Sequence, residues 1–210
     1  MLKKHFNLRF NYRHYKTMLK NDIWITQMAE KGMISPFQPA QVRSVDDHPV
    51  ISFGLSSFGY DIRLSPKEFK IFRHIPGTVV DPKRFSPDNL ETAKLHNDGK
   101  DSFFILPAHS YGLGVALERL EMPDNITAIC MGKSTMARVG VIANITPVEA
   151  GWRGYLTLEF SNSSSADCRV YANEGIVQLL FLEGEPCSVS YHSRSGKYQD
   201  QTEVVTIARV

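Results

Sequence analysis

Hydrophobic residues recur at helical spacing near the start of the chain and at shorter, irregular intervals afterwards. The helical stretch covers about residues 20–31, and its apolar positions are Leu19, Ile23, Trp24 and Met28. Gly32 follows where a helix C-cap would lie. We expect one short amphipathic helix there.

Beyond this helix, runs of β-branched and aromatic residues alternate with Gly, Pro, Asn and Asp at the interval typical of β-sandwiches and barrels. The expected strands are residues 60–64, 69–72, 102–106, 111–117, 126–131, 141–145, 155–161, 168–171, 176–181 and 188–191. The polar stretch 82–100 is expected to be a loop. The pattern has no internal repeat and predicts a mainly β protein.

Composition agrees with one domain. The chain has 210 residues, 42% of them hydrophobic, which is enough for a single sizeable core. No run approaches 18 consecutive apolar residues, so we expect a soluble protein without a membrane partner. Its three widely spaced cysteines, Cys130, Cys168 and Cys187, fit a reducing compartment, and we predict a cytoplasmic location.

The net charge of +2 is unevenly distributed. Residues 1–17 carry five basic side chains and no acidic one, so subtracting those five leaves −3 for the rest. A slightly acidic body gives no general case for nucleic-acid binding. Residues 1–17 are compatible with a nucleic-acid arm or a targeting peptide, but we expect a basic extension, either disordered or arising from a non-native start, ahead of Met18.

One carboxylate stands out in the strand pattern of residues 155–160. Period-two alternation places Leu156, Leu158 and Phe160 on one face, and Tyr155, Thr157 and Glu159 on the other. A glutamate in this position is most often simply exposed. Beside a ligand pocket, however, desolvation would raise its pKa toward neutrality and suit it to act as a general base on water.

Residues 133–138 form a second polar feature, directly after an apolar strand and Gly132. The run is Lys133, Ser134, Thr135, Met136, Ala137 and Arg138. One turn of helix here would present free backbone N–H groups and cationic side chains to a phosphate. A polar turn with a capping hydroxyl explains the run equally well when it is taken alone.

Two loops add further donors and acids. Residues 148–154 carry Glu149 and Trp152 into the 155–160 strand, and residues 195–201 form a late, glycine-containing segment able to fold over a phosphate tail. A hairpin with a packed Trp and a solvated tail are the simpler readings of the two loops.

Several motifs are missing. The zinc-dependent nucleobase deaminases pair H-x-E with P-C-x-x-C, and neither occurs here. The seven histidines are scattered, and there is no Walker or G-x-G-x-x-G loop. If the chain activates water, we expect it to do so without zinc.

Seven ordered blocks between about residues 20 and 201 resemble the dCTP deaminase family of the trimeric dUTPase-like superfamily. They are SFGYDIR (57–63), VDPK (80–83), GKSTMAR (132–138), NITP (144–147), WRGYLTLEFSN (152–162), ANEGIVQ (172–178) and GKYQDQ (196–201). The resemblance implies a distorted β-barrel or jelly roll, a homotrimer with sites at subunit interfaces, and Mg²⁺ bound with the nucleotide. It divides the chain into the extension 1–17, a β domain 18–190 and a C-terminal segment 191–210 that closes over the site.

The resemblance also implies roles for individual residues. Glu159 matches the catalytic base, and Ser134 and Arg138 match the residues that support it. The nucleotide-binding positions are Lys133, Ser134, Thr135, Met136, Ala137, Arg138, Thr157, Leu158, Glu159, Gln178, Tyr191, Lys197 and Gln201. The implied reaction is zinc-independent hydrolysis of dCTP to dUTP and ammonia, supplying dUTP for dUMP and dTTP synthesis.

Two related activities and one non-enzymatic role remain as alternatives. A dUTP diphosphatase, or a bifunctional enzyme that forms dUMP, would use Glu149 on the phosphate chain. A nucleotide-binding regulator would have lost catalysis. The chain also departs from the family pattern: it ends in residues 204–210 without the usual Gly and Leu-Pro, and it has Ala150 where many relatives have proline.

Overall fold

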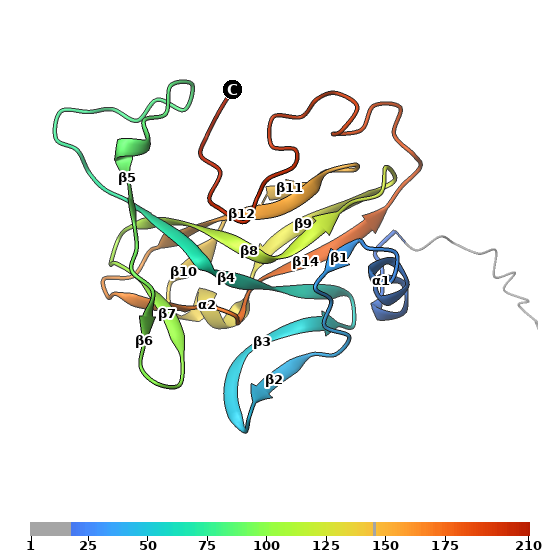
Figure 1. The fold of residues 1–210 in the computed structure, drawn as a ribbon, viewed down its shortest axis with the longest axis horizontal. Helices are drawn as coiled ribbons and strands as arrows, with labels where there is room; N and C mark the ends of the chain where they lie inside the picture. The colour runs from blue at the N-terminus through green and yellow to red at the C-terminus, as the bar shows by residue number, and fades with distance from the viewer. Residues whose placement is uncertain (1–17, 145) are drawn as a thin grey trace, which may run out of the picture.

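The computed structural model describes residues 18–144 and 146–210 and consists mostly of β-strands (Figure 1). The helices are α1 Asp22–Ala29, the 3₁₀ turn η1 Pro87–Asn89 and α2 Ser134–Arg138. The strands are β1 Ile34–Ser35, β2 Val42–Val45, β3 His48–Ser56, β4 Gly59–Phe72, β5 Leu90–Thr92, β6 His96–Asn97, β7 Ser102–Leu106, β8 Tyr111–Glu121, β9 Ile126–Gly132, β10 Val141–Ala143, β11 Thr146–Val148, β12 Arg153–Asn162, β13 Cys168–Tyr171 and β14 Gly175–Glu183.

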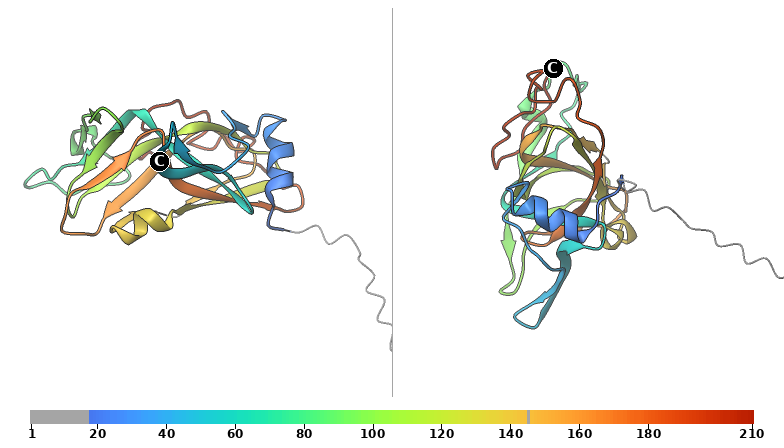
Figure 2. Two further views of the ribbon diagram at one scale, coloured as in Figure 1. Left: turned by 90° about the horizontal axis from the view of Figure 1, so that it is seen from below. Right: turned by 90° about the vertical axis from the view of Figure 1, so that its right-hand side faces the viewer.

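Most strands belong to one antiparallel sheet of eleven strands. Its main path is β10-β12-β8-β4-β14-β9-β11, with β1, β2, β3 and β5 attached to it, and a second sheet has the order β13-β7-β6. The large sheet curls on itself, and α1 lies across one end (Figure 2). The predicted class, a mainly β distorted barrel with a short N-terminal helix, is confirmed.

Aromatic rings fill the interior of the curled sheet. The ring of Phe69 stacks on Phe104 with centroids 5.2 Å apart and on Phe160 at 6.1 Å. A Cβ at Gly112, on the neighbouring strand β8, would lie 2.6 Å from the Phe69 ring. The glycine is therefore required by the close approach of that ring, which explains why β8 carries a residue of low strand propensity.

A partly buried ion pair joins β4 to β8. Glu118 on β8 is fully buried, and it accepts hydrogen bonds from the backbone N–H of Arg63 at 2.9 Å and from its Nε at 2.7 Å. The Arg63 guanidinium also lies over the ring of Phe53, 4.9 Å from its centroid. Burial raises the pKa of Glu118, whereas the charge and hydrogen bonds of Arg63 lower it. The pair therefore ties β4 to β8 at a point where either group alone would be costly.

Several elements agree with the sequence prediction. The helix is confirmed as α1, whose N-cap Asn21 accepts a hydrogen bond from the Trp24 N–H at 3.1 Å. The helical turn after Gly132 is α2. The strands at 102–106 and 168–171 begin and end where predicted, and 111–117, 126–131, 155–161 and 176–181 lie within longer strands.

Other elements differ. Residues 60–64 and 69–72 are one strand, β4, with a register shift between Leu64 and Phe69 where its pairing with β8 is irregular. The strand predicted at 188–191 is wrong, because these residues bend back to pack on the 148–154 loop, where the Tyr191 N–H donates to Ala150. The predicted loop 82–100 contains η1, β5 and β6, and the β2–β3 hairpin was missed. Residues 1–17 and Ile145 lie outside the described residues.

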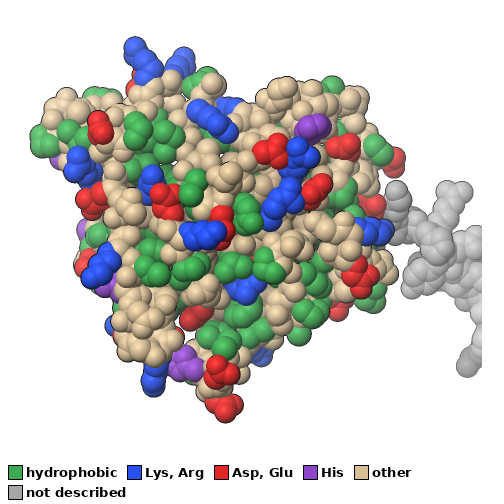
Figure 3. Space-filling view, viewed as in Figure 1, with side chains coloured by type: hydrophobic (Ala, Val, Ile, Leu, Met, Phe, Trp, Pro, Cys, Tyr) green, Lys and Arg blue, Asp and Glu red, His purple; other side chains and the backbone are tan. Residues whose placement is uncertain are grey.

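The surface is mixed in charge. On the face in Figure 3, cationic and acidic side chains are interspersed without a large area of one sign. Among the described residues, no helix has both the length and the apolar character needed to cross a membrane.

Removing the buried carboxylate should destabilise the fold severely. Glu118→Ala would leave Arg63 largely buried without its partner and would open a space beside β8, and we expect the free energy of unfolding to fall by about 3 kcal/mol. Chemical denaturation measures this loss. The matched control is Glu121→Ala on the same strand, which removes an exposed ion pair with Arg119 and should cost at most about 1 kcal/mol. Equal losses for the two variants would contradict the role given to Glu118.

Candidate functional site

Glu159 projects from the middle of β12, a strand held between β10 and β8. Ala143 on β10 pairs with Phe160, and Glu159 itself pairs with Leu113 on β8. Leu158 and Phe160 point into the core, with exposed fractions of 3% and 0%. Alternation therefore turns Glu159 to the opposite face, as the sequence predicts.

The Glu159 carboxyl is largely withdrawn from water. Burial raises its pKa from an ordinary 4.5 to about 7. Among the described residues no cationic side chain forms an ion pair with it. Its charge in turn raises the pKa values of Tyr111 and Cys130, for which burial is the larger cause. A carboxyl poised near neutrality can both accept a proton from water and return it.

Glu159 faces a cavity of about 590 Å³. The C-terminal segment forms one wall of the cavity with Tyr191, Lys197 and Gln201, and Thr157 lies on the β12 side. Much of the remaining wall is formed by aromatic side chains, by β11 and by the residue that follows it: Phe72, Phe85, Tyr111, Trp152, Tyr198, Thr146, Pro147, Val148 and Glu149. The cavity thus combines an apolar lining with a few polar groups, as small-molecule sites commonly do.

The C-terminal segment is attached directly to β12. Gln201 accepts a hydrogen bond from the Tyr155 N–H at 3.0 Å, and its side chain accepts one from the Thr157 hydroxyl at 3.0 Å. A Cβ at Gly154 would lie 2.7 Å from the Gln201 nitrogen, and Gly154 has φ +134°. Only glycine allows the segment to approach this closely. In Figure 1 the segment, drawn in dark red, runs beside β12 and β11.

The predicted phosphate-binding run lines a different cavity, of about 890 Å³. Lys133, Ser134, Thr135 and Gln178 lie in its wall, together with the buried Asp61. Asp61 forms an ion pair with Lys133 and accepts a hydrogen bond from Gln178 Nε2 at 3.0 Å. The lysine is therefore held in place by a carboxylate. Ser134 and Thr135, at the first turn of α2, are exposed.

The rest of α2 divides between core and surface. Met136 is buried and anchors the turn, whereas Ala137 and Arg138 are exposed. The Arg138 guanidinium donates to the Ser134 carbonyl at 3.0 Å, within its own helix. No described residue lines both cavities, so a single chain does not bring Ser134 and Arg138 into the cavity of Glu159.

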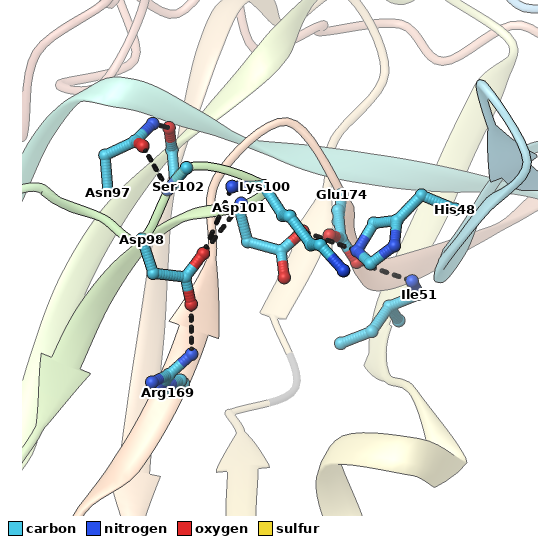
Figure 4. A network of polar contacts seen from close by, with 10 residues as sticks. His48, Ile51, Asn97, Asp98, Lys100, Asp101, Ser102, Arg169 and Glu174 are labelled. Atoms are coloured by element: carbon cyan, nitrogen blue, oxygen red, sulfur yellow. Dashed lines mark hydrogen bonds and ion pairs between the residues drawn. The ribbon is translucent and has the colours of Figure 1, made fainter.

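A carboxylate-rich network borders the second cavity (Figure 4). Glu174 accepts the Ile51 N–H, and His48 Nε2 lies 3.1 Å from an Asp101 oxygen. Burial is the largest cause that raises the pKa of Glu174, and the nearby Asp101 adds to it. These contacts attach the β2–β3 hairpin to the body beside Lys133.

Sequence reasoning missed two features of these cavities. The SFGYDIR motif contains Asp61 without indicating its role, although a carboxylate between Tyr60 and Ile62 in a strand pattern signals a buried, partnered acid. Tyr111 is a strand residue of β8, as the sequence predicts, and in addition it lines the Glu159 cavity and accepts a hydrogen bond from Asn144 Nδ2 at 2.9 Å. Nothing in the sequence indicates that contact, because the two residues are far apart along the chain.

The described side chains that could act as metal ligands do not form an obvious metal centre. Among residues 18–144 and 146–210, no three His, Cys, Asp or Glu side chains cluster in a way that could hold an ion. The zinc independence expected from the sequence stays a prediction, as does Mg²⁺ bound with the nucleotide.

Comparison with known proteins identifies the family. Residues 19–184 match the family described as dCTP deaminase-like. The chain belongs to this family. A dCTP deaminase of Paracidovorax citrulli is 50% identical over 188 residues, covering 89% of this chain and 96% of that protein. A dCTP deaminase of Nitrosomonas eutropha is 46% identical over 194 residues, covering 91% and 99%.

A solved structure agrees at the level of the fold. The crystal structure of 2'-deoxycytidine 5'-triphosphate deaminase from Agrobacterium tumefaciens matches with a TM-score of 0.53 and 17% identity, over 80% of this chain and 48% of that chain. The family resemblance expected from the seven sequence blocks is confirmed. The individual residue roles that it implies stay predictions.

The raised pKa of Glu159 predicts that this residue destabilises the fold at neutral and alkaline pH. Below about pH 4.5 the carboxyl is protonated in both the folded and the unfolded chain; above pH 7 the folded chain holds a buried, ionised group. Glu159→Gln should therefore stabilise the protein by on the order of 2–3 kcal/mol at pH 8, and the gain should vanish near pH 4.5. Denaturant titrations across this pH range measure it. A gain independent of pH would contradict the assignment.

Proposed function

We propose that the protein hydrolyses the amino group of dCTP, giving dUTP and ammonia and so supplying dUTP for dUMP and dTTP synthesis. The observation that carries this proposal is Glu159, a carboxyl with no ion-pair partner among the described residues and a pKa of about 7, which faces a largely apolar cavity. Membership of the dCTP deaminase-like family supports the choice of substrate, as do relatives named dCTP deaminase that match nearly the whole chain.

Glu159 serves as the proton shuttle in the proposed reaction. It accepts a proton from water while the water oxygen attacks C4 of cytosine, which forms a tetrahedral centre. The same carboxyl returns that proton to the amino group, and the C4–N bond breaks to release ammonia. A pKa near the working pH favours both transfers. The Ser134 hydroxyl and a backbone carbonyl near Thr146 orient the water, so that positioning takes the place of zinc.

Cationic and hydroxyl donors hold the triphosphate. Lys133, Ser134 and Thr135 offer donors at the start of α2, where free backbone N–H groups also favour anions, and Arg138 adds a guanidinium at its end. Gln178 stands beside them, and Tyr191, Lys197 and Gln201 approach from the C-terminal segment. Mg²⁺ enters as part of the substrate, bound to the phosphate oxygens.

These two groups of residues meet only if two copies of the chain share a site. The Glu159 cavity and the Lys133 cavity have no lining residue in common within the described chain. We therefore assign the protein to a homotrimer in which one subunit supplies Glu159 and the C-terminal segment, and its neighbour supplies α2. A closed ring of three is a regular outcome of such a head-to-tail contact.

Purified protein given dCTP and Mg²⁺ should release ammonia and accumulate dUTP. Glu159→Gln should abolish ammonia release and retain nucleotide binding, because the amide has a similar shape but cannot accept the proton. Ammonia assays and calorimetric titration with dCTP measure the two properties. Ammonia release by the variant at the parental rate would remove Glu159 from the reaction.

Chromatography of the nucleotide product separates this proposal from its rivals. Formation of dUMP would indicate a bifunctional enzyme, for which Glu149 is the candidate second acid, since it lies in the Glu159 cavity as an ion pair with Arg194. Cleavage of dUTP with no action on dCTP would indicate a diphosphatase, and no turnover of either nucleotide a regulator. Activity lost to a chelator and restored by Zn²⁺, but not by Mg²⁺, would overturn the metal-free step.

Shared sites make a separate prediction about mixed assemblies. Ser134→Ala and Glu159→Gln should each be inactive when expressed alone. Co-expression should restore part of the activity, because a site between the two variants can combine an intact Glu159 with an intact Ser134. To test this, mixed assemblies are purified through two different tags, one on each variant chain, and their deaminase activity per assembly is measured. If every site lay within one chain, mixing would restore nothing.

A further inference from the structure

A hydrogen bond between two side chains spans β12 beside Glu159. Tyr111 lies on β8 and Asn144 directly follows β10, and these strands flank β12 on its two sides. The Asn144 side-chain amide donates to the Tyr111 hydroxyl at 2.9 Å. We call this contact the Tyr111–Asn144 bridge.

The pairing of the strands places the bridge on the face of β12 that carries Glu159. Tyr111 pairs with Ser161 and Leu113 with Glu159, so these four side chains share one face of the β8–β12 ladder. On the other side, the Asn144 N–H donates to the Glu159 carbonyl at 3.0 Å. Asn144 is therefore fixed to Glu159 through its backbone and to Tyr111 through its side chain.

Other contacts keep the bridge rigid. The Tyr111 ring meets Phe72 edge to face, with centroids 5.2 Å apart, and both rings line the Glu159 cavity. Both Tyr111 and Asn144 are half-buried. A bridge built from a packed ring and a backbone-anchored amide has little freedom to move.

We propose that the Tyr111–Asn144 bridge is a positioning device that holds the Glu159 carboxyl in its orientation and keeps water from its β10 side. The proposal rests on the proposed deaminase function, since it explains how that reaction keeps its base in place. Tyr111 and Asn144 act through Glu159 and need not touch the nucleotide.

Burial, and not the charge of a neighbouring group, is the main cause of the raised pKa of Glu159. Tyr111 on β8 and Cys130 on β9 are close enough to respond to its charge, and both are neutral at pH 7 because burial raises their pKa values. The charged groups of the same cavity are Lys197 and the Glu149–Arg194 ion pair. Opening the bridge would therefore act chiefly by admitting water to the carboxyl, which lowers the pKa of Glu159.

Tyr111→Phe tests the bridge, because it removes one hydroxyl and keeps the ring against Phe72. We expect kcat for dCTP to fall about tenfold, the usual effect of losing one hydrogen bond that orients a reacting group, with KM nearly unchanged. The acidic limb of the pH profile of kcat should move to lower pH by about one unit, because Glu159 becomes better hydrated. A purely structural role would leave that limb in place.

Asn144→Ala should reproduce both changes, and the double variant should be no worse than either single one, because each removes the same bridge. Tyr155→Phe is the matched control on β12, where the hydroxyl has no hydrogen-bond partner among the described residues, and it should leave kcat and the pH limb unchanged. Additive losses, or an unmoved pH limb in Tyr111→Phe, would overturn the proposal.

A second measurement does not depend on activity. The difference in unfolding free energy between Tyr111→Phe and Tyr111→Phe/Glu159→Gln, measured across pH, reports the protonation of Glu159. The midpoint of this pH dependence should lie at lower pH than the midpoint for the parental protein compared with Glu159→Gln. If the parental protein failed to deaminate dCTP, the proposed function would fall, yet this midpoint would still support or overturn the bridge. An unchanged midpoint would overturn it.

Discussion

The packing of β12 is the constraint on which the rest of the site depends. Leu158 and Phe160 must enter the core for the sheet to close around its aromatic interior, and alternation then leaves Glu159 no direction but the opposite face. The aromatic lining and the C-terminal segment cover that face, so the same strand that completes the core also creates a carboxyl with a perturbed pKa. Fold stability and candidate chemistry are thus set by adjacent residues of one strand.

Three carboxylates in this protein illustrate two opposite solutions to burial. Asp61 forms an ion pair with Lys133 and accepts a hydrogen bond from Gln178, and Glu118 forms an ion pair with Arg63. The negative charge of each of these two carboxylates is therefore balanced by a basic side chain. Glu159 has no such partner among the described residues, and its pKa rises to about 7. The paired acids serve the architecture, whereas the unpaired acid is the one suited to exchange protons.

The sequence predicted what depends on local pattern. The alternation around Glu159, the helical turn after Gly132 and the mainly β class follow from residue spacing, and the family follows from seven ordered blocks. Contacts between segments that are distant in the sequence could not be predicted. They are the Tyr111–Asn144 bridge, the ion pair of Asp61 with Lys133, and the packing of residues 188–191 on the 148–154 loop. The strand predicted there failed because packing against Ala150 outweighed its short apolar pattern. The β2–β3 hairpin is fixed to the body by tertiary contacts of His48 and Ile51, which no local pattern reveals.

The route of the C-terminal segment affects where a purification tag can be attached. Val205 is buried against Leu113 and Val115, its N–H is bonded to Glu68, and only a few residues separate it from the exposed Val210. A purification tag fused after Val210 would therefore begin only a few residues from a segment that walls the Glu159 cavity, and it would place bulky, mobile chain beside the entrance of that cavity.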